Sequence, residues 1–196
     1  MLKKGAMFGL DARIALAIFG ALSVISGAAL YSAIKQAKVV AIVTELTEIQ
    51  KAYESYMLDV GEQVEKSSSV NYIIKYSDLI ASTKTGWKGP YLSYNLDLFN
   101  ANYEYPAKYG NLALRTYIEA DWGVDLLAGT QIAPTLCVRG ADCKIFIGWH
   151  TVDIDLAKSV DEYIDGVSDG QKGKIKLYNL DPTYKHIWFD TGITYK

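Results

Sequence analysis

Apolar residues fill a long stretch near the start of the chain, and a different pattern follows it. No charged side chain occurs between residues 14 and 34. A mostly apolar run of this length can cross a hydrocarbon core of about 30 Å as one helix. A cleaved secretory signal would have a shorter run that ends in small residues, whereas this run continues into an amphipathic stretch. The pattern predicts a retained membrane-spanning helix.

Beyond residue 38, apolar side chains recur every three or four positions, which is the spacing of one helix face. They are Val39, Ile42, Val43, Leu46, Ile49, Tyr53, Tyr56 and Met57. Gly61 then gives a helix stop signal. We expect one helix from about Phe8 to about Asp59, which at 1.5 Å per residue is about 78 Å long. Its second half is expected to support a folded domain.

Shorter elements are predicted after Gly61. A short helix is expected from Tyr72 to Ile80, and alternating apolar and polar positions predict a strand over residues 111–119. Residues 136–138 and 143–147 flank a turn and predict a hairpin. Residues 153–164 predict a helix that ends at Gly166, and its inward side chains are expected to be Leu156, Val160, Tyr163 and Ile164. Residues 174–178 and 185–189 predict two late strands. The predicted fold class is α+β, with a long N-terminal helix packed on a C-terminal antiparallel β-sheet.

The residues ahead of the apolar run have an order of their own. Lys3 and Lys4 form a short basic leader, Gly5 and Ala6 follow, and the segment MFGLD, residues 7–11, leads into the run. This order resembles the N-terminus of type IV pilins and of type II secretion pseudopilins. The resemblance implies that a peptidase cuts between Ala6 and Met7 and methylates the new N-terminus. It also implies a role for Asp11 in filament assembly, as the partner of the N-terminal amine of a neighbouring subunit.

The chain departs from the family pattern at three of these positions. Ala6 replaces the commoner glycine, Asp11 replaces the usual glutamate, and Arg13 lies just beyond the acid. A carboxylate at the end of a membrane helix is costly unless it is paired or reaches the interface. The alternative to the assembly role is therefore that Asp11 and Arg13 sit as a pair at the membrane boundary. Lys3, Lys4 and Arg13 precede the apolar run, which favours a cytoplasmic N-terminus and an outward-facing domain.

The expected organisation has three parts. Residues 1–6 form a cleaved leader, residues 7–35 a transmembrane or filament-core helix, and residues 36–196 a globular domain that includes the second half of the long helix. Within that domain the segment GWKGPYL, residues 86–92, resembles the W-x-G-P-Y-L segment of major pseudopilins and some pilins. Its glycines and proline predict a fixed turn, which two aromatic side chains anchor to the core.

Cys137 and Cys143 are the only cysteines, and five residues separate them. A zinc site would need more ligands than this pair and the distant His150 and His186 provide. A disulfide across so short a loop suits an oxidising compartment. The alternative is two free thiols, which exposure to the cytoplasm would favour.

Acidic residues concentrate among glycines between residues 153 and 169. Carboxylate oxygens such as those of Asp161, Asp165 and Asp169 are the ligands that Ca²⁺ prefers. The spacing does not match the EF-hand pattern. Residues 161–173 also resemble a D-x-x-I-D-G loop that precedes a late strand in pilin-like domains, where it is mainly a structural turn. The three residues are thus a candidate calcium site, with an ordinary solvated acidic turn as the alternative.

Other functional classes find little support in the sequence. The chain contains no H-E-x-x-H, P-loop or G-x-G-x-x-G motif, so we expect neither an enzyme nor a bound cofactor. His150 and His186 border apolar strands, where an orienting hydrogen bond is the expected role. The formal net charge of -2 and the lack of a basic stripe make nucleic acid an unexpected partner.

The resemblance implies a structural subunit of a bacterial type IV pilus, a helical filament used in adhesion, motility or DNA uptake. The protein is then expected in the inner membrane as a precursor and afterwards in an extracellular pilus. Its implied partners are copies of itself, a prepilin peptidase, and an assembly platform with a cytoplasmic ATPase. One alternative is a pseudopilin that builds a short periplasmic filament in a type II secretion system. A second alternative, from another class, is a single-pass anchor that presents a periplasmic binding domain.

Overall fold

The computed structural model describes residues 5–68, 70–100, 102–118, 121–138, 140–179 and 181–196, with the backbone alone for residues 5–8 and 10. The chain divides into two compact units, residues 1–40 and residues 41–196. The long helix α1, Gly5–Val60, begins in the first unit and continues into the second. No proline interrupts this stretch of sequence, and the expected long N-terminal helix is confirmed.

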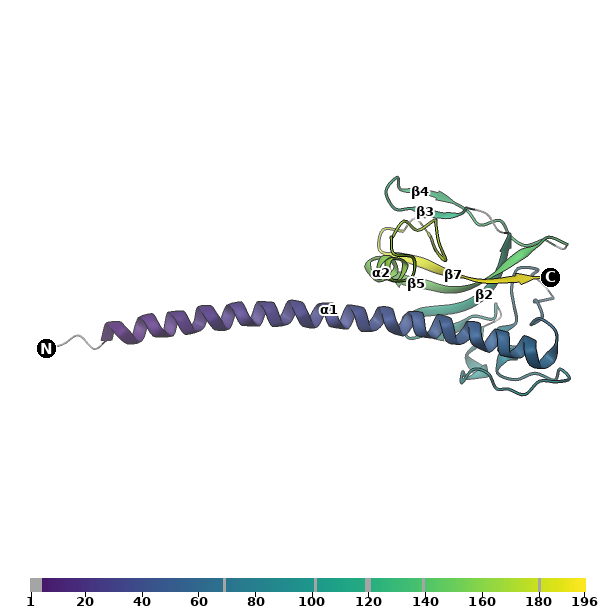
Figure 1. Ribbon diagram of the computed structural model, residues 1–196, viewed down its shortest axis with the longest axis horizontal. Helices are drawn as coiled ribbons and strands as arrows, with labels where there is room; N and C mark the ends of the chain where they lie inside the picture. The colour runs from purple at the N-terminus through teal and green to yellow at the C-terminus, as the bar shows by residue number, and fades with distance from the viewer. Residues whose placement is uncertain (1–4, 69, 101, 119–120, 139, 180) are drawn as a thin grey trace. The chain divides into compact units, whose positions relative to one another are not determined.

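The second unit contains a five-stranded antiparallel sheet (Figure 1). Its strands lie in the order β1-β2-β5-β7-β6, and a separate two-stranded sheet pairs β3 with β4. The strands and the second helix are β1 (Tyr105–Ala107), β2 (Gly110–Ile118), β3 (Gly123–Asp125), β4 (Thr130–Ile132), β5 (Cys143–Asp153), α2 (Ile154–Asp165), β6 (Ile175–Tyr178) and β7 (Tyr184–Tyr195). Two short 3₁₀ helices, η1 (Tyr76–Leu79) and η2 (Leu96–Leu98), lie in the segment between α1 and β1. The predicted α+β class is confirmed.

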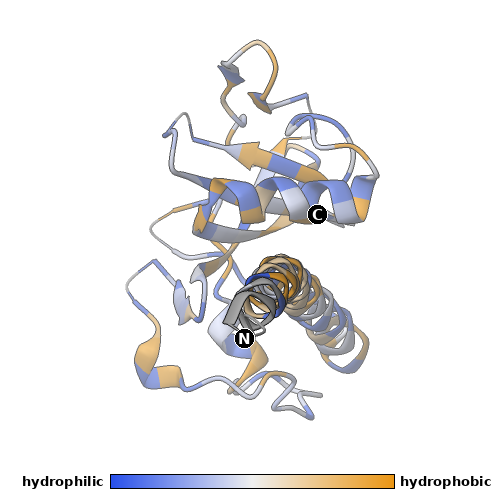
Figure 2. Cartoon of the chain, turned by 90° about the vertical axis from the view of Figure 1, so that its left-hand side faces the viewer, coloured by the Kyte–Doolittle hydropathy of each residue, from blue (hydrophilic) through white to orange (hydrophobic). Residues whose placement is uncertain are grey.

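The second half of α1 packs its apolar stripe against one face of the sheet. Within the second unit, this part of the helix lies between the sheet and the segment that follows α1 (Figures 1 and 2). Ile42, Leu46, Ile49, Tyr53 and Tyr56 are all buried, as their spacing predicts. Cross-strand pairing gives the facing side of the sheet its apolar residues, which are Leu112, Leu114, Ile145, Ile147, Trp149, Ile187 and Phe189.

The opposite face of the sheet carries a second, aromatic core. Tyr117, Phe146 and Trp188 project from β2, β5 and β7, and Trp122 packs over them from just before β3. The ring of Trp188 lies over Gly148, where an added Cβ atom would approach it to 2.4 Å. The sheet is therefore buried on both faces, which explains why β2 and β5 are apolar along most of their length.

Helix α2 follows the sequence signals for its two ends. The side chain of Asp153 accepts hydrogen bonds from the backbone N–H groups of Asp155 and Leu156, and Gly166 ends the helix in a left-handed conformation. Leu156 and Val160 are buried as predicted, whereas Tyr163 is exposed. The prediction of an inward Tyr163 was wrong because the buried face of this short helix is completed by Ala157 and Asp161 instead.

Two predicted elements take different forms. The hairpin expected from residues 136–138 and 143–147 does not form, because Leu136 pairs with Tyr117 at the end of β2 while the strand from Cys143 pairs with β2 and β7. The helix expected over residues 72–80 is reduced to η1, since Ile73 pairs with Arg115 of β2. In both places backbone pairing with a distant strand replaces the local structure.

Amide side chains bind the C-terminal part of β7, beyond the residues that pair with β6. Gln50 of α1 donates a hydrogen bond to the carbonyl oxygen of Thr191, and Gln63 donates one to that of Thr194. The Oε1 atom of Gln63 also accepts a hydrogen bond from the backbone N–H of Lys196. These contacts fix the C-terminal strand beside the end of α1 and the loop that follows it.

Candidate functional site

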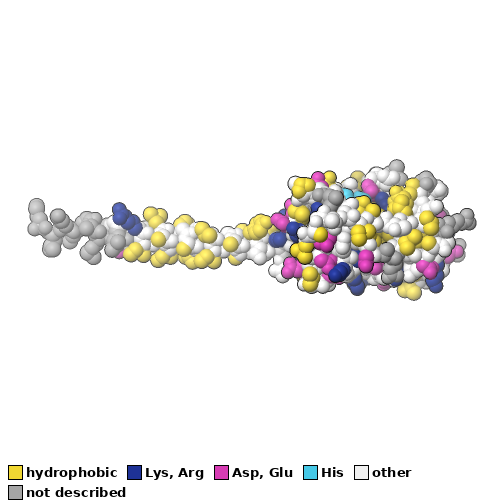
Figure 3. Space-filling model, turned by 90° about the horizontal axis from the view of Figure 1, so that it is seen from above, with side chains coloured by type: hydrophobic (Ala, Val, Ile, Leu, Met, Phe, Trp, Pro, Cys, Tyr) yellow, Lys and Arg dark blue, Asp and Glu magenta, His cyan; other side chains and the backbone are white. Residues whose placement is uncertain are grey.

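The first unit presents a continuous apolar surface. Every described side chain of α1 from residue 11 to residue 34 is exposed. The large hydrophobic members are Ile14, Leu16, Ile18, Phe19, Leu22, Val24, Ile25, Leu30, Tyr31 and Ile34. Figure 3 shows hydrophobic side chains along most of this part of the chain, with charged side chains near its start. Of the described residues, α1 alone is long and apolar enough to cross a membrane, judged by length and composition.

A surface of this kind requires a covering of lipid or protein. Exposed hydrophobic patches on soluble monomers rarely exceed a few hundred Å². Small residues also interrupt the apolar surface: a Cβ atom added at Gly20 or Gly27 would have no atom within 4 Å, so a neighbouring helix has room to approach there. The hydroxyl of Ser23 donates a hydrogen bond to the carbonyl of Phe19 and is therefore satisfied without a partner chain.

The residues predicted for processing lie at the edge of the described structure. Lys3 and Lys4 of the predicted leader lie outside the described residues, and Ala6 and Met7 are described only as backbone within α1. Asp11 and Arg13 are exposed. The cut after Ala6 and the assembly role of Asp11 therefore stay predictions.

The GWKGPYL segment is anchored to the C-terminal end of α1. The Tyr91 hydroxyl and the Lys88 ammonium group donate to the two carboxylate oxygens of Asp59, at 2.9 and 3.0 Å. These two donors, of which Lys88 has the larger effect, hold the pKa of the Asp59 carboxyl below its usual value. The Trp87 and Tyr91 rings meet edge to face at 5.9 Å, and the Trp87 indole N–H donates to the carbonyl of Asp78. The predicted fixed turn with aromatic anchors is present, and its hydrogen bonds to Asp59 hold it against the C-terminal end of α1.

Comparison with known families gives one match, to a family described as "Type II secretion system (T2SS), protein G", over residues 29–120. The match supports the pilin and pseudopilin family. It includes the last six residues of the apolar stretch, the buried stripe of α1, the GWKGPYL segment and β2. No curated protein and no solved structure matches the chain.

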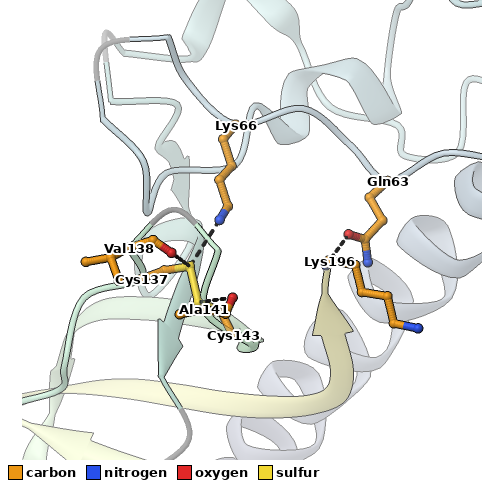
Figure 4. The surroundings of a disulfide bond; sticks show 7 residues. All are labelled: Gln63, Lys66, Cys137, Val138, Ala141, Cys143 and Lys196. Atoms are coloured by element: carbon orange, nitrogen blue, oxygen red, sulfur yellow. Dashed lines mark hydrogen bonds between the residues drawn. A yellow bond between two sulfur atoms is a disulfide. The ribbon is translucent and has the colours of Figure 1, made fainter.

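The part of the chain that follows the match contains the disulfide. Cys137 and Cys143 are bonded, with their Cα atoms 5.9 Å apart, and the bond closes the loop between Leu136 and β5 (Figure 4). The Lys66 ammonium group lies 3.1 Å from the Cys137 sulfur and 4.1 Å from the centre of the Tyr195 ring. Burial lowers the pKa of Lys66. The disulfide loop, the loop after α1 and the C-terminal strand therefore meet at this point.

The three candidate calcium ligands share one loop, yet their carboxylates have separate tasks. Asp161 accepts the backbone N–H of Gly170, Asp165 accepts those of Lys174 and Ile175, and the side chain of Asp169 accepts those of two residues that follow it. Among the described residues no three acidic, histidine or cysteine side chains are grouped so that they could hold a metal ion. The arrangement fits a structural turn held by carboxylates, and calcium binding remains a hypothesis.

Asp161 should give the domain a measurable pH dependence. Its side chain is fully buried, its Oδ1 atom has no hydrogen-bond partner, and burial raises the pKa of its carboxyl to about 7. The folded state thus favours the protonated acid, so its contribution to stability is complete below about pH 3.8 and is lost as the pH rises toward 7. We expect Asp161→Asn to be more stable than the wild type at pH 8, by about 1 kcal/mol or more, and equal to it near pH 4. Urea unfolding at the two pH values tests this.

The same variant tests the calcium hypothesis. If Ca²⁺ binds through Asp161, adding about millimolar calcium to chelator-treated protein should raise the melting temperature of the wild type. The Asp161→Asn variant should then respond less. An unchanged wild-type melting temperature would remove the calcium site.

A polar cluster that the sequence did not predict lies on the aromatic face of the sheet. Glu104, from the residue before β1, pairs with Arg115 of β2 at 3.0 Å and lies 3.5 Å from Nδ1 of His150. The rings of His150 and His186 are 4.8 Å apart, and Nδ1 of His186 accepts the backbone N–H of Thr151. The orienting role expected for His186 is thus observed, while His150 lies beside the ion pair of Glu104 and Arg115.

Burial makes this cluster sensitive to acid. Desolvation, reinforced by His186 and opposed by Glu104, lowers the pKa of His150 to about 4. The folded state therefore holds His150 neutral. The contribution of His150 to stability is complete above about pH 6.5 and is lost as the pH drops toward 4. Asp161 changes stability in the opposite direction over the same pH range, so the test is the difference between two proteins that both keep Asp161. We expect the urea midpoint of the wild type to fall, relative to that of His150→Gln, between pH 7 and pH 4.5. Equal slopes in both proteins would contradict the assignment.

Proposed function

We propose that this chain is the repeating subunit of a helical filament that assembles through its N-terminal helix. The main observation in support is that α1 exposes an uncharged, mostly apolar surface over residues 14–34, in a chain whose residues 29–120 match a pseudopilin family. Side-by-side packing of such helices removes their apolar surface from water or lipid, and small residues on one side permit close approach. The folded domain then decorates the outside of the filament.

Within this class the family match favours a pseudopilin of a type II secretion system, with a short filament in the periplasm. A type IV pilus is the second candidate. The disulfide between Cys137 and Cys143 favours it, because a covalently closed C-terminal loop suits a fibre exposed outside the cell. Long fibres in a sheared surface fraction would support the pilus, and their absence from cells that secrete through the system would support the pseudopilus.

The proposed processing is a cut between Ala6 and Met7 on the cytoplasmic side by a prepilin peptidase, followed by methylation. An assembly platform in the inner membrane would then transfer subunits into the filament. Intact mass and N-terminal sequencing of protein from the membrane and the sheared fraction test this step. A chain that begins at methylated Met7 in the filament fraction supports the proposal. A chain that keeps its Met1 and stays in the membrane would favour a single-pass anchored domain instead.

Asp11 supplies a sharper test of assembly. We expect Asp11→Ala to reduce filament recovery by about tenfold or more, because a charge partner is lost inside an apolar contact. Membrane insertion should be unaffected, since the apolar run is intact. Glu48→Ala, which removes an exposed acid further along the same helix, is the matched control and should assemble normally. Normal filaments from Asp11→Ala would contradict the proposal.

A further inference from the structure

Asp11 and Arg13 lie on nearly opposite sides of α1. Both side chains are exposed, and they are two positions apart in a continuous helix. A helix with 3.6 residues per turn rotates by about 200° over two positions. Residues at this spacing do not face one another, so the two charges cannot form a pair within one helix.

The two side chains are also isolated from other charges. From residue 11 to residue 34 they are the only charged residues, and the next charge along the helix is Lys35. Among the ion pairs formed by described side chains, none involves Asp11 or Arg13. When the apolar surface of α1 is covered in a filament, both charges enter apolar surroundings. An unpaired charge there is strongly unfavourable, whereas a well-formed pair is tolerated.

We propose that the Arg13 guanidinium of one subunit pairs with the Asp11 carboxylate of the next subunit in the filament. This inference rests on the proposed filament function and adds a residue to its assembly contact. Each helix presents one acid on one side and one base on the other, so each copy satisfies its neighbour's charge. The guanidinium fork can bind both carboxylate oxygens, which fixes the axial position of the two helices as well as their contact.

The opposed directions of the two side chains also decide the symmetry of the contact. In a two-fold pair of parallel helices, Asp11 and Arg13 of each copy would have to face the same neighbour. Their separation of about 200° forbids this. The contact is therefore head-to-tail, with a different neighbour on each side, and contacts of this type generate open helical assemblies. The terminal amine of Met7 can share the same carboxylate, because a carboxylate accepts several hydrogen bonds.

A charge exchange tests the pair directly. We expect Arg13→Gln to reduce the sheared filament fraction by about tenfold or more, and the single reversals Asp11→Arg and Arg13→Asp to abolish it. The double variant Asp11→Arg with Arg13→Asp keeps the net charge of the segment and should recover at least part of the filament. Lys35→Gln is the matched control, since it removes a charge from the same helix outside the proposed contact. Membrane insertion is measured in every variant.

Disulfide trapping provides an independent readout. Wild-type chain in excess supports filament assembly, so that small amounts of a chain with Asp11→Cys and of a chain with Arg13→Cys can be incorporated together. Cells that carry both variants with the wild type should form cross-linked dimers of the two, whereas cells that carry the wild type with either variant alone should not. Filaments from Arg13→Gln at wild-type levels, or no cross-link in filaments that contain both cysteine variants beside the wild-type chain, would overturn the pair and leave the filament intact. A wild-type chain that never leaves the membrane would overturn the proposed function itself.

Discussion

Replacing Glu104 by glutamine should lower the free energy of unfolding of the domain by about 3–5 kcal/mol. The Arg115 side chain is only 6% exposed, and Glu104 is its ion-pair partner at 3.0 Å. Burial lowers the pKa of Arg115, yet a guanidinium stays charged at neutral pH. Loss of Glu104 would therefore leave a buried charge without its counter-ion. Chemical unfolding at pH 7, followed by tryptophan fluorescence, measures the effect.

A double variant separates this explanation from simple loss of packing. Glu104→Gln combined with Arg115→Met removes both charges and keeps an apolar side chain of similar length in β2. We expect the double variant to be more stable than Glu104→Gln alone, because an apolar replacement of a buried pair is often neutral or stabilising. A double variant that is less stable than either single change would contradict an ion-pair role.

The second large effect is expected at Gly86, which opens the GWKGPYL segment. Its φ angle is +88°, and an added Cβ atom would lie 2.5 Å from the carbonyl oxygen of Asp59. That oxygen belongs to the backbone of the last turn of α1, so it cannot move away as a side chain would. Gly86→Ala should lower the free energy of unfolding by about 3 kcal/mol or more, the sum of backbone strain and a steric clash.

Gly61 offers a control for the strain alone. It has a φ angle of +77°, close to that of Gly86, but an added Cβ atom there would have no atom within 4 Å. Gly61→Ala should therefore cost only about 1–2 kcal/mol. Equal losses in the two variants would mean that the approach of the segment to α1 contributes nothing. Both variants are compared by urea unfolding of the same domain.

Local patterns in the sequence predicted the two α-helices well. The spacing of Ile42, Leu46 and Ile49 marks the buried stripe of α1, and Asp153 and Gly166 mark the two ends of α2. These features depend on residues within a few positions of each other, so they can be recognised from the sequence without knowledge of the fold. The pilin resemblance and the disulfide were accessible for a similar reason, since each rests on a short segment.

Features that depend on distant residues were not predicted. Residues 136–138 have the composition of a strand, and only the position of β2 decides that Leu136 pairs with Tyr117 and not with the strand that follows. The cluster of Glu104, Arg115 and His150 is assembled from three separate elements. A single arginine in the apolar strand β2 was its one visible sign, because a buried guanidinium requires an acid. The identity of that acid depends on the fold.

The hydrogen bonds from Gln50 and Gln63 to the C-terminal part of β7, which extends beyond its pairing with β6, have a consequence for crowded subunits. A strand with free carbonyl and N–H groups is a template on which a strand of another molecule can add, and this is how cross-β aggregates grow. Domains held close together on a membrane or a fibre meet one another at high local concentration. By occupying the carbonyl oxygens of Thr191 and Thr194, the two glutamines leave less of this part of β7 open to a foreign strand. In the proposed filament, assembly would then proceed through the helix, while amyloid-like growth through the sheet is discouraged.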